Sequence, residues 1–131
     1  MDILARFCSQ DTSAYTHCED PANPNHGPLQ EMEAQLRSFR TLDGKPYRLV
    51  PLPLPEQLWL EDYPLPASYA NFLILNGAVL IPGTGGALDE VAAARLRPVF
   101  PDRQVEVIDC RALLSGHGGL HCITMNYPEG W

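Results

Sequence analysis

The chain has 131 residues, with 9 Lys and Arg against 16 Asp and Glu, so its formal net charge is −7. This acidic balance excludes a protein that binds nucleic acid through the phosphate backbone, because two polyanions repel each other. Hydrophobic residues make up 45% of the chain and charged residues 19%, which indicates a globular protein rather than a disordered one. A chain of this length can bury roughly two-thirds of its unfolded surface without disulfide staples.

Apolar residues at 3–8 suit a strand, and the proline-rich stretch 19–28 reads as a loop. Apolar side chains then recur every three or four residues over 29–39, which is the spacing of an amphipathic helix. A turn at 42–45 ends this helix. The following strand, 47–54, contains Pro51 and Pro53 and runs into Pro55, so it must finish at a sheet edge or in an extended loop.

The second half begins with apolar runs at 68–75 and 78–81 around an Asn-Gly pair, a strong signal for a hairpin. An apolar stripe predicts a helix over 88–96, and 105–110 reads as a buried strand. A glycine-rich loop and a strand over 121–126 complete the chain. The order predicts a mixed α/β protein built from two similar units.

No segment predicts insertion into a membrane or export. The longest apolar run, 72–82, is interrupted by Asn76 and Gly77 and is shorter than the roughly 20 residues of a spanning helix. The N-terminus has neither the basic nor the apolar region of a signal peptide. We therefore expect a cytoplasmic protein whose cysteines are free thiols.

The stretch 116–124, Gly-His-Gly-Gly-Leu-His-Cys-Ile-Thr, is the most informative for chemistry. Its glycines allow the backbone to approach a ligand closely, and Cys122 follows at the mouth of the expected strand. A nucleophile would lie in such a place. A buried structural thiol is the alternative, because free cysteine is among the most buried residue types.

The histidines of this stretch are weaker candidates. Neighbouring side chains of a strand point to opposite faces, so His121 would point away from a pocket that Cys122 faces. His117 lies in the loop, where solvation is the simpler interpretation. The glycines exclude a helical metal site formed by these two histidines. A second group of cysteines and histidines fits no known spacing of metal ligands. Its members are expected to have packing or loop roles: Cys8, His17, Cys18 and His26.

Several segments together carry a family resemblance. In order they are 65–72 (Leu-Pro-Ala-Ser-Tyr-Ala-Asn-Phe), 76–82 (Asn-Gly-Ala-Val-Leu-Ile-Pro), 100–103 (Phe-Pro-Asp-Arg), 108–111 (Ile-Asp-Cys-Arg) and 119–124 (Gly-Leu-His-Cys-Ile-Thr). This set resembles the C-terminal part of agmatine deiminase, the bacterial and plant branch of the peptidyl-arginine deiminase family. The resemblance runs from Asp2 through Pro128.

The resemblance implies a partial pentein, the five-bladed α/β propeller of ββαβ modules. About two modules are expected, roughly 1–55 and 65–131, and residues 1–131 would form the C-terminal portion of a single catalytic domain. It further implies a hydrolase that converts agmatine and water to N-carbamoylputrescine and ammonia in putrescine biosynthesis. The family uses no metal or other cofactor. Its partner is a small cationic guanidine, and we expect a homo-oligomer.

The same resemblance assigns roles to individual residues. Cys122 matches the catalytic nucleophile, and Asp2 matches the aspartate of a His-x-Asp motif, although alone it reads as an exposed residue at a strand end. Asn71, Gly118 and Gly119 are assigned to substrate binding. A thiolate suits attack on a guanidinium carbon, which is a poor electrophile.

The departures from the family pattern define the alternatives. The histidine of His-x-Asp and a Trp-x-Arg-Asp-x-Gly-Pro segment are absent, so we expect the chain alone to be catalytically inactive. His117 stands where glycine is usual. Free arginine or peptidyl-arginine are alternative substrates, and a thiol redox or metal-binding module is the remaining alternative.

Overall fold

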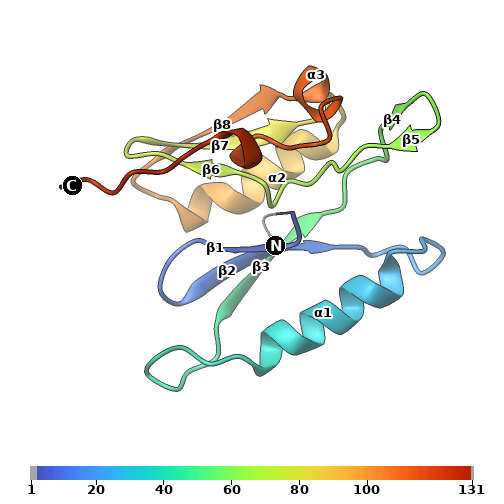
Figure 1. Ribbon diagram of the computed structural model, residues 1–131. Coiled ribbons are helices and arrows are strands. Elements are labelled where there is room, and N and C mark those ends of the chain that lie inside the picture. Colours follow the sequence, from blue (N-terminus) through green and yellow to red (C-terminus); the bar gives the residue numbers. More distant parts are fainter. Residues whose placement is uncertain (1–2, 131) are drawn as a thin grey trace.

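The computed structural model describes residues 3–130, which form strands and helices mixed along the chain (Figure 1). The strands are β1 (Ala5–Phe7), β2 (Thr12–His17), β3 (Arg48–Pro53), β4 (Trp59–Leu60), β5 (Tyr63–Pro64), β6 (Leu73–Ile74), β7 (Ala78–Gly83) and β8 (Gln104–Asp109). The helices are α1 (His26–Ser38), α2 (Leu88–Leu96) and α3 (Arg111–Leu114), with 3-10 turns η1 (Arg97–Val99) and η2 (His121–Ile123). The expected mixed α/β class is confirmed. None of the described helices is long and apolar enough to cross a membrane.

The first unit is a three-stranded sheet in the order β1-β2-β3, with α1 in the connection between β2 and β3. β1 is antiparallel to β2, whereas β2 and β3 are parallel, from the Thr12–Arg48 pair to the His17–Pro53 pair. Parallel neighbours need a long crossover, and α1 supplies it. β3 lies at the edge of this sheet, as its prolines predict, because proline cannot donate to a ladder.

The second unit repeats this arrangement with the strand order β6-β7-β8 and α2 in the crossover. β6 is antiparallel to β7, and β7 is parallel to β8, from the Ala78–Gln104 pair to the Gly83–Asp109 pair. The Asn-Gly hairpin is confirmed by the Leu75 N–H, which donates to the Ala78 carbonyl at 2.8 Å. Both units therefore have the order strand, strand, helix, strand and the same strand directions.

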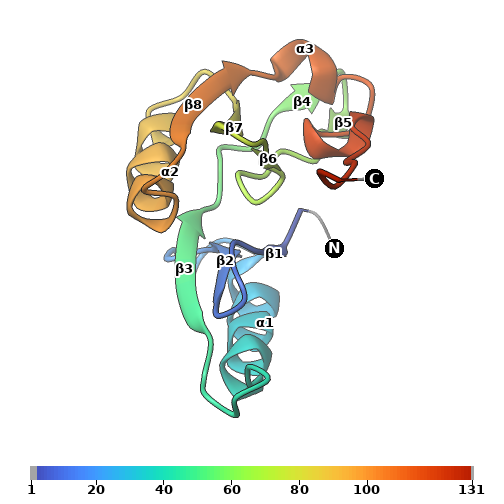
Figure 2. The same cartoon turned by 90° about the vertical axis from the view of Figure 1, so that its left-hand side faces the viewer.

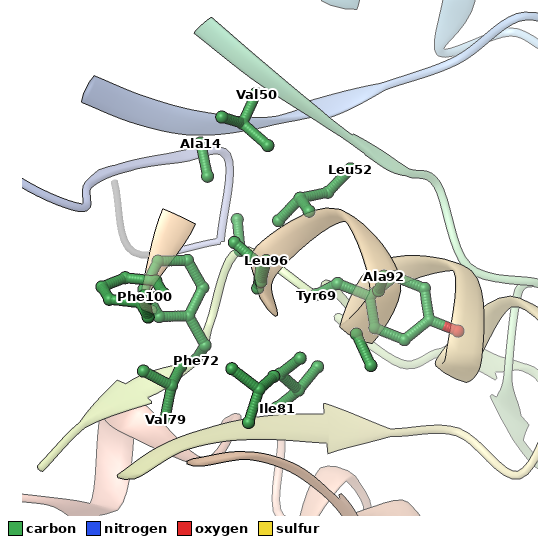
Figure 3. Packing of buried hydrophobic residues seen from close by; sticks show 13 residues of the cluster. Ala14, Val50, Leu52, Tyr69, Phe72, Val79, Ile81, Ala92, Leu96 and Phe100 are labelled. Carbon is green, nitrogen blue, oxygen red and sulfur yellow. The ribbon is translucent and has the colours of Figure 1, made fainter. Parts of the chain in front are cut away.

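The core lies on both sides of α2, which packs between the two sheets while α1 lies against β2 of the first sheet (Figures 1 and 3). The small side chains of Ala92 and Ala93 let α2 approach closely, and both are fully buried, as is Leu96. The first sheet contributes Ala14, Val50 and Leu52, and the second contributes Val79, Ile81 and Val105. Burial of these apolar side chains on both faces of one helix holds the two units together.

One strand was not predicted, and one predicted strand is wrong. The segment Thr12–His17 is the central strand of its sheet, although Thr, Ser and His give it no apolar alternation from which to predict it. Residues 121–126 do not form a strand: the chain makes the turn η2, and residues 124–126 have no regular structure. A backbone bond from the Thr124 N–H to the His121 carbonyl, 3.0 Å long, closes this turn.

Candidate functional site

Cys122 lies in η2, within the loop that follows α3, and is exposed to solvent. Leu120 fixes the loop to the fold, because it is buried in a small apolar cluster with Leu73 and Cys110. Figure 2 shows this part of the chain beside the β4–β5 hairpin. The exposed position rules out the alternative of a buried structural thiol at this residue.

The other cysteines differ from Cys122 in their surroundings. Cys18 and Cys110 are buried, and Cys8 is half-buried. Burial raises the pKa of the Cys8 thiol to about 11. Burial, followed by the nearby negative charge of Asp109, raises the pKa of the Cys110 thiol. Since the thiolate is the nucleophilic form, Cys8 and Cys110 are poorly reactive at neutral pH.

The segment before β6 carries Asn71 to the same place and is fastened to the first unit. The Ser68 hydroxyl donates to the carbonyl of Ile3 at 2.6 Å. Arg6 donates through Nη1 to the carbonyl of Phe72, and its guanidinium carbon lies 5.1 Å from the centre of the Phe72 ring. The position of Asn71 is therefore set by contacts of its neighbours Ser68 and Phe72 with Ile3, just before β1, and with Arg6 of β1.

The carboxamide of Asn71 meets the Cys122 loop through both of its polar atoms. Its Oδ1 accepts a 2.9 Å hydrogen bond from the backbone N–H of His121. Its Nδ2 lies 3.5 Å from the Cys122 Sγ, within range of a hydrogen bond to sulfur. Asn71 is 1% exposed, so its amide is directed at the protein. Asn71 and Cys122, two of the residues predicted from the sequence, are thus in contact.

The two glycines predicted for this site have different surroundings. A Cβ added to Gly119 would lie 2.1 Å from Oδ1 of Asn71, so no side chain fits there unless the amide moves. A Cβ added to Gly118 would lie 3.5 Å from the Cβ of Cys122, which is an ordinary contact. Gly119 is therefore required by the packing around Asn71.

His117 and His121 flank these glycines. His117 has a φ of 62°, the left-handed region that favours glycine, and its ring meets the Tyr63 ring edge-on with centroids 6.5 Å apart. The contact with Tyr63 was not predicted, because nothing in the sequence indicates that the β4–β5 hairpin reaches this loop. His121 begins η2, so the strand alternation that argued against it as a catalytic base does not apply.

The remaining candidates are not part of this site. Asp2 lies outside the described residues. His17 Nδ1 lies 3.1 Å from a Glu33 carboxylate oxygen, and His26 Nδ1 lies 2.8 Å from the Cys18 carbonyl, so both histidines make local contacts. Within residues 3–130, no group of three or more His, Cys, Asp or Glu side chains could hold a metal ion.

A cavity of about 380 Å³ lies between the two units and is separate from this site. It is lined by β2 and the loop after it, by the end of β3, and by one side of α2. Neither Asn71 nor Cys122 contributes to it. The cavity therefore provides no substrate pocket for the exposed thiol.

Comparison with known proteins gives the family. A family model of the Porphyromonas-type peptidyl-arginine deiminases matches residues 1–128. The chain belongs to this family. The match confirms the resemblance recognised in the sequence motifs, and among curated relatives the agmatine deiminase of Stutzerimonas stutzeri is 32% identical over 84% of the chain. A Streptomyces avermitilis protein, provisionally assigned as an agmatine deiminase, is 34% identical over 98% of the chain.

The chain spans little more than a third of these relatives, 35% of the S. stutzeri protein and 37% of the S. avermitilis protein. These matches do not support the narrower expectation that the chain corresponds to the C-terminal part of the family's domain.

Solved structures share the fold of this deiminase-family chain. A Porphyromonas gingivalis protein, provisionally assigned as an arginine deiminase, is 51% identical with a TM-score of 0.95 over 98% of the chain and 38% of its own. The agmatine deiminase of C. jejuni is 36% identical with a TM-score of 0.84 over 92% of the chain and 36% of its own. A cysteine-to-serine variant of the C. jejuni enzyme has been solved with substrate bound.

Proposed function

We propose that this protein hydrolyses a guanidinium group, converting agmatine and water to N-carbamoylputrescine and ammonia, a step toward putrescine. The observation that carries the proposal is the exposed thiol of Cys122, held against the Asn71 amide on a glycine-rich loop. The names of the relatives support the reaction class. The substrate-bound cysteine-to-serine variant of the C. jejuni enzyme supports a cysteine as the residue that reacts.

The proposed reaction has two covalent stages. The Cys122 thiolate attacks the guanidinium carbon and forms a C–S bond, and one C–N bond then breaks as the leaving nitrogen takes up a proton and departs as ammonia. The product of this stage is a thiouronium. Water then adds to the same carbon and loses one proton; as the C–S bond breaks, the added hydroxyl loses its proton too, and the neutral ureido product leaves with the thiolate restored.

Both stages need a group that moves protons and a carboxylate that binds the cationic guanidinium. The family resemblance proposes Asp2 as one such carboxylate, since a carboxylate can accept paired charge-assisted hydrogen bonds from guanidinium nitrogens. A histidine suits the proton transfers because its ordinary pKa lies near neutrality. Of the two loop histidines, His121 adjoins Cys122 and is the one to test, by replacement with asparagine.

We further propose that the two units are modules of a pentein, the five-bladed propeller. Their common strand order and directions support this assignment, as do the high TM-scores with deiminase structures. A structure of a longer protein that contains this chain tests it, because further copies of the same unit around one axis are required.

The experiment that tests the function is ammonia release from agmatine, measured for the chain and for Cys122→Ala. The chain spans little more than a third of its relatives, and we expect little turnover from it alone. Ammonia release well above background that is lost in Cys122→Ala would support the reaction and disprove the expected inactivity. The same release from Cys122→Ala would contradict the role of the thiol.

Substrate choice is tested with three guanidines at equal concentration: agmatine, free arginine and an arginine-containing peptide. We expect preference for agmatine, the substrate class named for the S. stutzeri and C. jejuni relatives. The peptide is the second candidate because the matching family is described as peptidyl-arginine deiminases. The expected homo-oligomer is tested separately, by light scattering of the chain as it elutes from a size-exclusion column.

A further inference from the structure

We propose that Asn71 is a positioning residue that holds and orients the Cys122 thiol, rather than a residue that binds substrate. The inference rests on the proposed role of Cys122 as the nucleophile. It replaces the substrate-binding role that the sequence motif gives to Asn71.

Accessibility argues against contact between Asn71 and a substrate. The side chain is 1% exposed, whereas Cys122 beside it is exposed. A substrate that reaches the thiol from solvent would still be separated from the Asn71 amide by protein atoms.

The hydrogen bonds of Asn71 give it two effects on the thiol. Its Oδ1 accepts from the His121 N–H at 2.9 Å, which fixes the residue directly before Cys122. Its Nδ2 can donate to Sγ over 3.5 Å, and a donor directed at sulfur stabilises the thiolate relative to the thiol. A carboxamide supplies both functions from one rigid group.

Gly119 keeps this amide in place. A Cβ there would lie 2.1 Å from Oδ1 and 2.7 Å from Cγ of Asn71, so any side chain at 119 would displace the whole carboxamide. At its other end, Asn71 is fixed through its own N–H, which donates to the Ser68 carbonyl at 3.2 Å. The amide is thus held from both sides, as expected of a group that orients another.

The decisive measurement is the rate of alkylation by iodoacetamide as a function of pH, corrected with Cys122→Ala for the other thiols. Asn71→Asp has nearly the same shape and keeps an acceptor for the His121 N–H, but it replaces the donor to Sγ by an oxygen. We expect the midpoint of the alkylation curve to rise by about one pH unit, because the thiolate loses a donor and gains a negative neighbour. An unchanged midpoint would overturn the proposal.

A second pair of variants tests the same amide without changing Asn71. Gly119→Ala should displace the carboxamide, slow alkylation at neutral pH several-fold and increase hydrogen exchange of the His121 amide. Gly86→Ala is the matched control, since its Cβ would meet nothing closer than 3.7 Å. Equal alkylation and exchange in the two alanine variants would overturn the proposal, even if Asn71→Asp did not fold. Because iodoacetamide reports on the thiol without any substrate, failure of agmatine hydrolysis leaves these results interpretable.

Discussion

The hydroxyl of Tyr69 donates a 2.8 Å hydrogen bond to Oδ1 of Asp89, which joins the segment before β6 to the first turn of α2. The same carboxylate accepts bonds from the N–H groups of Thr84 and Gly85, each 2.9 Å long. Tyr69 is fully buried, and Asp89 is the nearer partner of its hydroxyl, with the Thr84 hydroxyl 3.4 Å away. Asp89 therefore organises the β7–α2 loop in the core between the two units.

Replacement of Asp89 by alanine should lower the free energy of unfolding by about 2–3 kcal/mol, because it leaves a buried hydroxyl and two amides without their acceptor. Urea unfolding followed by circular dichroism measures the change. Glu90→Ala is the matched control in the same turn, since the Glu90 carboxylate forms an exposed ion pair with Arg97. Equal losses in the two variants would contradict this role of Asp89.

The ionisation of Asp89 should make stability depend on pH. Burial opposes its charge, but the hydrogen bonds from Thr84, Tyr69 and Gly85 outweigh burial and hold the pKa below its usual 3.8. A carboxyl with a lowered folded-state pKa stabilises the fold above the unfolded-state pKa, and this stabilisation is lost as the pH falls through the folded-state pKa. The urea midpoint of unfolding should be measured for the parent chain and for Asp89→Asn between pH 6 and 2, at constant salt. The difference between the two midpoints should narrow below about pH 4. A constant difference would show that this ionisation contributes nothing.

Gly83 should tolerate no side chain, because β7 approaches β8 and α2 closely there. An added Cβ would lie 2.7 Å from Cγ1 of Val107 and 2.9 Å from Oδ2 of Asp89. We expect Gly83→Ala to destabilise the chain by about 1–3 kcal/mol, the usual cost of overpacking. Gly86→Ala, measured in the same urea titration, should have much less effect, and the opposite order would contradict the packing described for β7.

Gly44 tests backbone conformation without any packing change. Its φ is 76° and no atom lies within 4 Å of an added Cβ, so Gly44→Ala should cost about 1–2 kcal/mol through backbone strain alone. Gly77 has equally open surroundings without the left-handed φ, and Gly77→Ala is the control. Thermal unfolding of both variants measures the difference, and equal midpoints would disprove the strain at Gly44.

Local patterns predicted the elements whose signals are local. The apolar spacing of Leu29, Met32 and Leu36 marks the inward face of α1, and the Asn-Gly pair marks the β6–β7 hairpin. β2 escaped prediction because its burial comes from α1, which packs against it, and from its place between β1 and β3. Sequence could not predict the turn at His121, since it is held by an amide 50 residues away in the chain.

Within the candidate site, the chemical types were more predictable than their arrangement. Cys122 and Gly119 stood out in a glycine-rich stretch, and Asn71 stood out in a family motif. The close contact between the buried Asn71 and Gly119 depends on how their two segments pack, and residue spacing in the sequence does not predict that packing. The strand expected at 121–126 gave a wrong reason for excluding His121.

The covalent role of Cys122 is tested by the intact mass of the protein after incubation with agmatine and rapid quenching in acid. We expect an adduct equal to agmatine minus ammonia, located on Cys122 by peptide mapping and absent from Cys122→Ala. The acid quench preserves a thiouronium because its hydrolysis requires deprotonation of water. An adduct of the same mass on another residue, or one that persists in Cys122→Ala, would contradict the proposed nucleophile.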